Sequence, residues 1–165
     1  MKGLKYFIAA CLLTVTAPAI IAAPAVATST SVTSTRPQPT PIAPLYPWVP
    51  AGGYPDRFPF GQCTWWAAYN HQVTWNGNAG DWLGNAAAQD VPIRFSPSIG
   101  AIVVYSRSST YSVFGHVANV IATGPGSYTV SEMNYLAWGA VDVRTIPWPD
   151  TNVSGFIPLE VKGWR

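Results

Sequence analysis

Residues 60–66, Phe60-Gly61-Gln62-Cys63-Thr64-Trp65-Trp66, decide the fold, because a helix is expected to begin inside this stretch. The loop-forming residues 59–61 come directly before it and set its start. Trp66 precedes Tyr69 and Asn70 by three and four residues, the spacing that gathers side chains on one helix face. We predict a short helix over residues 62–70, with Cys63 in its first turn.

Beyond this helix the pattern changes toward strands. A second helix is expected over residues 80–89, where Asp81 stands near the start and an Ala triplet lies inside. Strands are expected at residues 101–105, 116–122, 128–132 and 140–145, with a Gly-Pro-Gly turn at residues 124–126. Two helices followed by four or five short strands predict an α+β fold with an antiparallel sheet.

The N-terminal region is interpreted as a signal peptide over residues 1–27. Lys2 and Lys5 form a positive start, residues 6–21 are an apolar run, and Ala25-Val26-Ala27 suits cleavage. A retained membrane anchor is the alternative, and the polar and proline residues that interrupt the apolar run disfavour it. We therefore expect a secreted protein with no stable membrane anchor after cleavage.

The remaining 138 residues are divided into a linker and one domain. Residues 28–53 are rich in Thr, Ser and Pro and are expected to form an extended spacer, whereas residues 54–165 have a globular, aromatic-rich pattern. Loss of Lys2 and Lys5 leaves seven of the nine basic residues against seven acidic ones. This balance, without any basic run, argues against nucleic acid or an anionic membrane surface as a partner.

Cys63 is the one cysteine left after signal removal, because Cys11 lies in the signal peptide. A single exported thiol has no intramolecular disulfide partner, so it is either a reactive group or an inert buried side chain. Metal binding is disfavoured, since no second Cys or suitably spaced His accompanies it. The first turn of a helix favours the reactive interpretation, because unpaired N–H groups and the helix dipole lower a thiol pKa there.

A reactive thiol needs a base, and the chain offers two histidines, His71 and His116. His71 follows Cys63 by eight residues, and a helix of that length separates them by about 12 Å. His71 is therefore expected to be a helix-end or surface residue. His116 follows Gly115 at the head of a predicted strand and can face Cys63, although a lone strand histidine is more often structural.

A third group must orient the imidazole, and Glu132 and Asn134 are the candidates. They are two residues apart, so they project to the same face if the strand continues through both. Their strand is also expected to be the hairpin partner of the strand that begins at His116. The alternative for Glu132 is an ordinary solvated carboxylate.

Three blocks of sequence carry a resemblance to a known family. They are Gly61-Gln62-Cys63-Thr64-Trp65, Gly115-His116-Val117-Ala118 and Val130-Ser131-Glu132-Met133-Asn134-Tyr135. In this order and with these gaps they resemble the CHAP domain, the cysteine, histidine-dependent amidohydrolase/peptidase family, over residues 54–158. Residues 78–88 resemble the second helix of that family, residues 97–104 its first core strand and residues 155–157 its final strand.

The resemblance implies a papain-like α+β fold, with N-terminal helices packed on an antiparallel sheet of about five strands. It also implies hydrolysis of amide bonds in the peptide part of bacterial cell-wall peptidoglycan. By motif, Cys63 would be the nucleophile, and His116 would be the general base and then the general acid. Glu132 would orient the imidazolium, and Asn134 would be a supporting member of the site. Gln62, together with the Cys63 N–H, is a candidate for the oxyanion hole. Four tryptophans are expected as core and cleft walls: Trp65, Trp66, Trp82 and Trp138.

Some members of that family bind calcium through clustered Asp and Glu residues. The corresponding residues 106–114 contain no acidic side chain, so we expect no required metal or other cofactor. The expected partner is bacterial peptidoglycan, and the protein is expected to act as a monomer at the cell wall, as an N-acetylmuramoyl-L-alanine amidase or an endopeptidase. The alternative function is that of a non-catalytic wall-binding or adaptor domain with the same fold.

Overall fold

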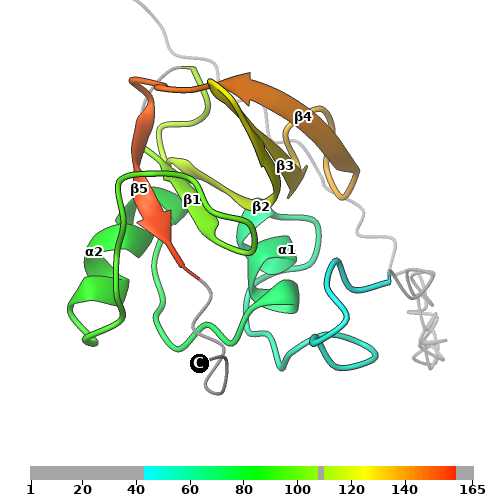
Figure 1. Ribbon diagram of the computed structural model, residues 1–165. Helices are drawn as coiled ribbons and strands as arrows, with labels where there is room; N and C mark the ends of the chain where they lie inside the picture. Colours follow the sequence, from blue (N-terminus) through cyan, green and yellow to red (C-terminus); the bar gives the residue numbers. More distant parts are fainter. Residues whose placement is uncertain (1–42, 108–109, 159–165) are drawn as a thin grey trace, which may run out of the picture. The chain divides into compact units, whose positions relative to one another are not determined.

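Two short helices precede a five-stranded antiparallel sheet in the computed structural model, which describes residues 43–107 and 110–158 (Figure 1). The helices are α1 (Cys63–Asn70) and α2 (Trp82–Ala87), with a 3-10 turn, η1 (Ala79–Asp81), before α2. The strands are β1 (Ile102–Tyr105), β2 (His116–Gly124), β3 (Ser127–Met133), β4 (Val141–Pro147) and β5 (Val153–Ile157), in the spatial order β4-β3-β2-β1-β5. The predicted α+β class and antiparallel sheet are confirmed.

Most element boundaries differ from the prediction by one or two residues, and two of the differences have a clear cause. The second helix ends at Ala87 rather than residue 89, and the chain leaves it through Asp90, whose φ is 58°. Strand β2 runs two residues further than expected, because the Pro125-Gly126 turn lets pairing continue as far as Gly124 and Ser127. Among the described residues, no helix has the length and apolar character needed to cross a membrane.

The helices cover one face of the sheet. Alternate residues of β1, Ile102 and Val104, join Val117 of β2 and Ile157 of β5 in one buried cluster with α1 and α2. The intervening residues Val103 and Tyr105 belong to a second cluster on the opposite face. This alternation is the period-two pattern of a strand buried on both sides.

The second face is strongly curved. Tyr128 of β3 and Phe156 of β5 have ring centroids 5.8 Å apart, although two strands separate β3 from β5 in the sheet. A flat sheet would place strands at those positions about 14 Å apart. The curvature makes a concave face, and the β1–β2 register pairs Tyr105 of that face with His116.

The concave face also receives Glu132 and Arg144. Glu132 lies two residues from Val130 in β3, and Arg144 of β4 is paired with Val130, which belongs to the concave cluster. Because side chains alternate along a strand, all three lie on one side of the sheet. The fold therefore brings an imidazole, a carboxylate and a guanidinium together from three neighbouring strands.

The segment before the domain is not an extended spacer throughout. Residues 1–42 lie outside the described residues, so the expected signal peptide and the first part of the linker fall there. Tyr46 and Val49 are buried, the Tyr46 hydroxyl donates to the Val120 carbonyl at 3.0 Å, and the Leu45 N–H donates to Asn70 at 2.8 Å. Apolar side chains between the prolines are buried against the domain, and the proline content alone does not predict this packing.

Candidate active site

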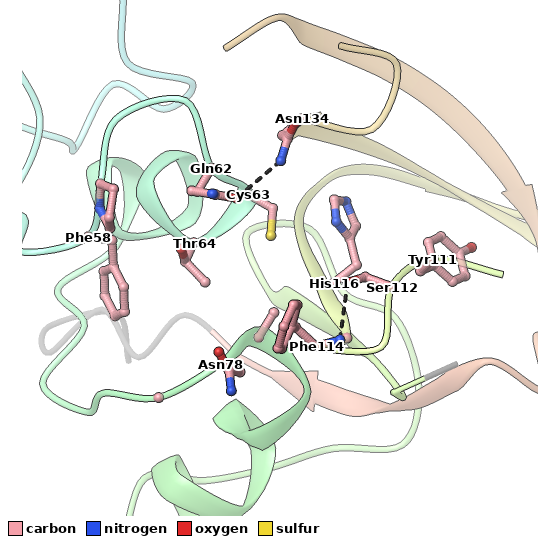
Figure 2. A pocket seen from close by; sticks show the side chains of 14 residues that line it. Phe58, Gln62, Cys63, Thr64, Asn78, Tyr111, Ser112, Phe114, His116 and Asn134 are labelled. Atoms are coloured by element: carbon pink, nitrogen blue, oxygen red, sulfur yellow. Dashed lines mark hydrogen bonds between the residues drawn. The ribbon is translucent and has the colours of Figure 1, made fainter. Parts of the chain in front are cut away.

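Cys63 is the first residue of α1, as predicted. Gln62 is its N-cap, with extended backbone, and Cys63 is a free cysteine that is 9% exposed. Backbone N–H groups of Thr64 and Val117 donate hydrogen bonds to its sulfur, so the start of β2 reaches the start of α1. Figure 2 shows the sulfur directed toward the imidazole of His116.

His116 stands at the first position of β2, where a close backbone contact fixes its strand. Gly115 has φ of 76°, and the Gly80 N–H donates to the Phe114 carbonyl at 2.9 Å. A Cβ at Gly115 would overlap the backbone of Gly80. Glycine at residue 115 thus allows η1 and β2 to approach, and His116 is 5% exposed as a result of this packing.

The imidazole of His116 lies between a thiol and a carboxylate. Its Nε2 is 2.7 Å from Oε2 of Glu132, and the Cys63 side chain is near enough to raise the pKa of the imidazole. With Nε2 occupied by the carboxylate, Nδ1 is the ring nitrogen available to sulfur. The three side chains are therefore neighbours in the order that a nucleophile, its base and the group that orients the base require.

The electrostatics of these three side chains favour an ion pair. Burial alone would raise the pKa of the Cys63 thiol, but hydrogen bonding to His116 and its charge lower that pKa overall. Burial alone would lower the pKa of His116, but its hydrogen bonds to Cys63 and Glu132 raise it to about 9. Both shifts favour the thiolate–imidazolium pair over the neutral thiol and imidazole.

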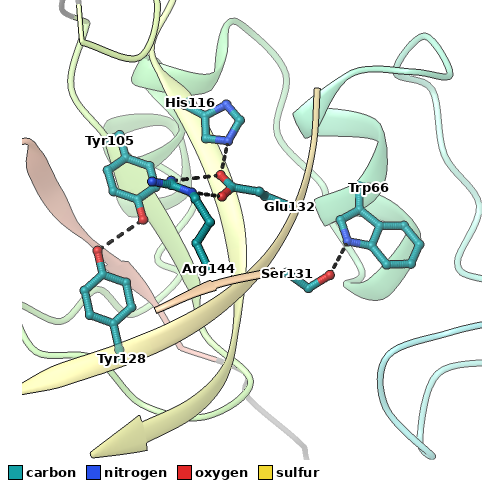
Figure 3. A network of polar contacts seen from close by, with 7 residues as sticks. All are labelled: Trp66, Tyr105, His116, Tyr128, Ser131, Glu132 and Arg144. Atoms are coloured by element: carbon teal, nitrogen blue, oxygen red, sulfur yellow. Dashed lines mark hydrogen bonds and ion pairs between the residues drawn. The ribbon is translucent and has the colours of Figure 1, made fainter. Parts of the chain in front are cut away.

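Glu132 is fully buried and has a second partner that the sequence did not indicate (Figure 3). Arg144 Nε donates to Oε1 of Glu132, and Arg144 Nη2 donates to Oε2 at 3.2 Å. Burial would raise the pKa of Glu132, but His116 and Arg144 together hold it below its usual value. Glu132 is therefore not an ordinary solvated carboxylate.

Asn134 does not contact the imidazole as the same-face argument expected. Strand β3 ends at Met133, and Asn134 has φ of 64°, so the strand alternation does not continue through it. Its Nδ2 instead donates to Oε1 of Gln62 at 3.1 Å. Since Oε1 of Gln62 accepts this hydrogen bond, the NH₂ group of the Gln62 side chain is directed away from Asn134.

These residues open onto a cleft of about 490 Å³. Cys63, His116, Gln62 and Asn134 all line it. Its other walls come from the loop before α1, from η1 and from the loop before β2, with Phe58, Thr64, Asn78, Tyr111, Ser112 and Phe114 among the lining residues. Trp138 packs on Gly61, just before α1, and is 55% exposed. Trp66 and Trp82 are core residues, as expected.

His71 is a helix-end residue, but it is buried and not on the surface. It is the C-cap of α1, its ring makes an edge contact with Tyr46, and burial lowers its pKa to about 4. His71 therefore lies at the opposite end of α1 from Cys63. Within the described residues, no group of three or more His, Cys, Asp or Glu side chains is arranged to hold a metal ion.

Arg144, Tyr111 and Tyr135 are the site residues that sequence reasoning missed. Arg144 is the one Lys or Arg between Arg107 and Lys162, and it falls on a predicted strand, which is a usable signal. The two tyrosines lie in loops, and their rings come within 5.8 and 6.2 Å of the His116 ring. No spacing in the sequence indicates those contacts.

Comparison with known proteins gives a consistent set of similarities. Residues 53–134 match the sequence profile of the CHAP domain. The chain is 37% identical over 106 residues to a Staphylococcus aureus protein named probable autolysin SsaALP, covering 59% of this chain and 38% of that protein. It is 35% identical over 108 residues to N-acetylmuramoyl-L-alanine amidase sle1 of Staphylococcus saprophyticus, covering 60% and 32%.

A solved structure is also similar. A crystal structure of an N-acetylmuramoyl-L-alanine amidase from Staphylococcus aureus matches with a TM-score of 0.47 and 30% sequence identity, covering 52% of this chain and 27% of that one. The chain thus spans less than half the length of the proteins it matches.

Proposed function

Residues 53–134 of this chain belong to the CHAP domain family, and from that premise we propose that the protein is an exported peptidoglycan hydrolase acting at the cell wall. Its substrate would be an amide bond in the peptide part of peptidoglycan. The names of the relatives, an autolysin and an amidase, support this substrate class. The observation that carries the proposal is that Cys63 and His116 line the cleft side by side, with Glu132 hydrogen-bonded to the imidazole of His116.

The first half of the proposed reaction forms an acyl-enzyme. The Cys63 thiolate attacks the scissile carbonyl carbon, so a C–S bond forms and the carbonyl oxygen becomes negative. The Cys63 N–H and the Gln62 NH₂ group donate to that oxygen, and the hydrogen bond from Asn134 to Gln62 supports the second role by restraining the Gln62 amide. When the C–N bond breaks, the His116 imidazolium gives its proton to the departing amine.

The second half releases the product. Neutral His116 takes a proton from a water molecule as that water attacks the thioester carbon. The C–S bond then breaks, the peptide or glycan fragment leaves as a carboxylic acid, and the thiolate–imidazolium pair is restored. Glu132 remains ionised throughout and stabilises the imidazolium whenever it forms.

Two bonds fit this chemistry. Cleavage between the lactyl group and L-alanine would make the protein an N-acetylmuramoyl-L-alanine amidase, and cleavage within the stem peptide or cross-bridge would make it an endopeptidase. Mass spectrometry of the released fragments distinguishes them. An amidase frees stem peptides that begin with L-alanine, whereas an endopeptidase leaves part of each peptide attached to the glycan.

The test compares the purified protein with its Cys63→Ala variant on isolated cell walls. We expect the parent to release soluble fragments and Cys63→Ala to release none above the background without protein. Equal release by the parent and Cys63→Ala would refute the nucleophile assignment. A parent that sediments with walls but releases nothing would instead support the non-catalytic wall-binding alternative.

A further inference from the structure

Arg144 contacts Glu132 on strand β3 and belongs to the polar network around His116. It is not among the residues that line the cleft, and its side chain is 24% exposed. We propose that Arg144 is a positioning residue for the reaction, which holds the Glu132 carboxylate on the His116 imidazole and balances its charge. The proposal rests on the proposed function in that it assigns Arg144 a part in the same reaction.

The geometry of the pair is that of a fork on a carboxylate. Two nitrogens of one guanidinium, Nε and Nη2, donate to the two different oxygens of Glu132. Paired donation of this kind restricts rotation of the carboxylate more than a single contact does. Because Oε2 also accepts from His116, the Arg144 fork fixes the oxygen on which the imidazole depends.

The guanidinium is itself held in place by two aromatic rings. Its Cζ lies 3.6 Å from the centroid of Tyr135 and 5.6 Å from that of Tyr111. The Tyr111 ring is nearly parallel to the His116 ring, with an interplanar angle of 14°. The same two tyrosines therefore contact both the cation and the imidazole, so the orientation of Arg144 is coupled to the catalytic ring.

The charges of Cys63, His116, Glu132 and Arg144 sum to zero only with Arg144 present. In the reactive state the thiolate of Cys63 and the carboxylate of Glu132 are negative, while His116 and Arg144 are positive. A neutral replacement at residue 144 would leave this buried group with one net negative charge. A buried cluster with excess negative charge binds a proton at higher pH, and that proton removes either the thiolate or the carboxylate.

Other titratable groups around Glu132 do not replace the guanidinium. Asp142 is the cross-strand partner of Glu132, and burial together with the charge of Glu132 raises its pKa. Burial likewise raises the pKa of Tyr105 and of Tyr111, which keeps both phenols neutral. None of these three side chains can supply a positive charge, so Arg144 is the cation that Glu132 depends on besides His116.

The experiment measures the pH dependence of Cys63 alkylation by iodoacetamide, read on the Cys63 peptide by mass spectrometry. In Arg144→Met we expect the acid limb of the profile to move to higher pH by about one unit. At a fixed pH below the limb, Cys63 would then be alkylated roughly tenfold more slowly than in the parent. Arg144→Lys restores the charge and should keep the parent's acid limb. Arg94→Met is the control, because the Arg94 side chain donates to its neighbour, the Ile93 carbonyl, in a different part of the sheet.

Two results would overturn the proposal. One is an acid limb in Arg144→Met that coincides with the parent's, and the other is an equal shift in Arg144→Lys and Arg144→Met, which would indicate a purely structural effect. Near-UV circular dichroism checks that each variant is folded. If Arg144→Met is unfolded, Arg144→Gln, which is also neutral but retains a donor, takes its place with the same two outcomes.

The alkylation measurement separates this proposal from the proposed function. Iodoacetamide needs no wall substrate, so the profile can be measured even if the parent hydrolyses no cell wall. Failure of wall hydrolysis with the expected shift in Arg144→Met would reject the proposed substrate and leave the role of Arg144 standing. Wall hydrolysis by the parent with an unshifted alkylation profile in Arg144→Met would reject the role of Arg144 and leave the proposed substrate standing.

Discussion

Cys63 and His116 each have a pKa moved toward the charged form, and the two shifts define a pH window for activity. Below the window the thiol of Cys63 is protonated, and activity rises with pH as that proton is lost. The His116 pKa, lowered by burial but raised to about 9 by its two hydrogen bonds, sets the upper edge, because the imidazolium is lost above it. We therefore expect a bell-shaped profile of kcat/KM with a descending limb near pH 9.

Replacement of Glu132 by glutamine should move that descending limb. Glu132→Gln keeps the shape of the side chain but removes the negative charge that stabilises the imidazolium, so the limb should fall by about one pH unit or more. Loss of the oriented base should also lower kcat on the order of a hundredfold. Glu132→Gln is thus expected to move its limb to lower pH, whereas Arg144→Met is expected to move the acid limb to higher pH. A descending limb that stays near pH 9 in Glu132→Gln would contradict the assigned role.

Asn134 tests a different contact. Because it donates to Gln62 and not to His116, Asn134→Ala should lower kcat while leaving both limbs of the pH profile in place. Gln62→Ala should cost more, on the order of a hundredfold, if its amide donates to the developing oxyanion. The double variant should be no worse than Gln62→Ala alone. A shifted limb in Asn134→Ala would show instead that Asn134 acts on the imidazole.

At the level of single residues, spacing in the sequence predicted some contacts of the site and missed others. Cys63, His116 and Glu132 were expected to meet from helix-start and strand-pairing arguments, and the structure brings them together. The partner of Asn134 was not predictable, since it depends on β3 ending at Met133 and on a left-handed residue after it. Arg144 was missed because its contact arises from the register of β3 with β4, which a linear pattern does not specify.

At the scale of elements, the contact between η1 and β2 positions the base. Gly115→Ala would place a methyl group on the backbone of Gly80 and impose a strained φ, so we expect a loss of about 2 kcal/mol or more in the free energy of unfolding. His116 would be displaced as the two elements separate, and activity should fall even at temperatures where the variant remains folded. Urea denaturation and wall hydrolysis measure the two effects.

Gly84→Ala provides the matched control, since it adds the same methyl group within α2, where nothing lies within 4 Å. Alanine is the better helix former, so this change should leave activity unchanged and stabilise the protein by about 0.5–1 kcal/mol. Similar effects of the two substitutions would contradict the assigned role of the Gly80–Gly115 contact. The two helices and the first four strands were predictable from periodicity and the last strand from the family resemblance, but this close approach was not predictable.

At the scale of the whole molecule, the segment at residues 45–49 belongs to the folded unit and lies before the residues that match the CHAP domain profile. Tyr46→Ala removes a buried ring and its hydrogen bond to Val120, and should lower the free energy of unfolding by roughly 3 kcal/mol. Trp48→Ala is the control, because Trp48 is 42% exposed and stacks on the outside of Tyr46.

The Trp48 change should cost less than about 1 kcal/mol. Equal, small losses in the two variants, measured by urea denaturation, would show that the segment contributes nothing to stability. This segment was assigned to the linker from its composition, because it is rich in proline. The two apolar anchors, Tyr46 and Val49, become recognisable only when the surface that receives them is known.

If the proposed function holds, the cleft described above has a consequence for the choice of peptidoglycan substrate. Among its lining residues only Cys63 and His116 are expected to carry full charge, and they carry opposite signs. A free carboxylate on the substrate would lose its hydration there without gaining a cationic partner. Stem peptides whose side carboxyl groups are amidated should therefore be hydrolysed faster than unamidated ones. Matched walls from a strain with and without its amidating activity would reveal the preference as a difference in KM.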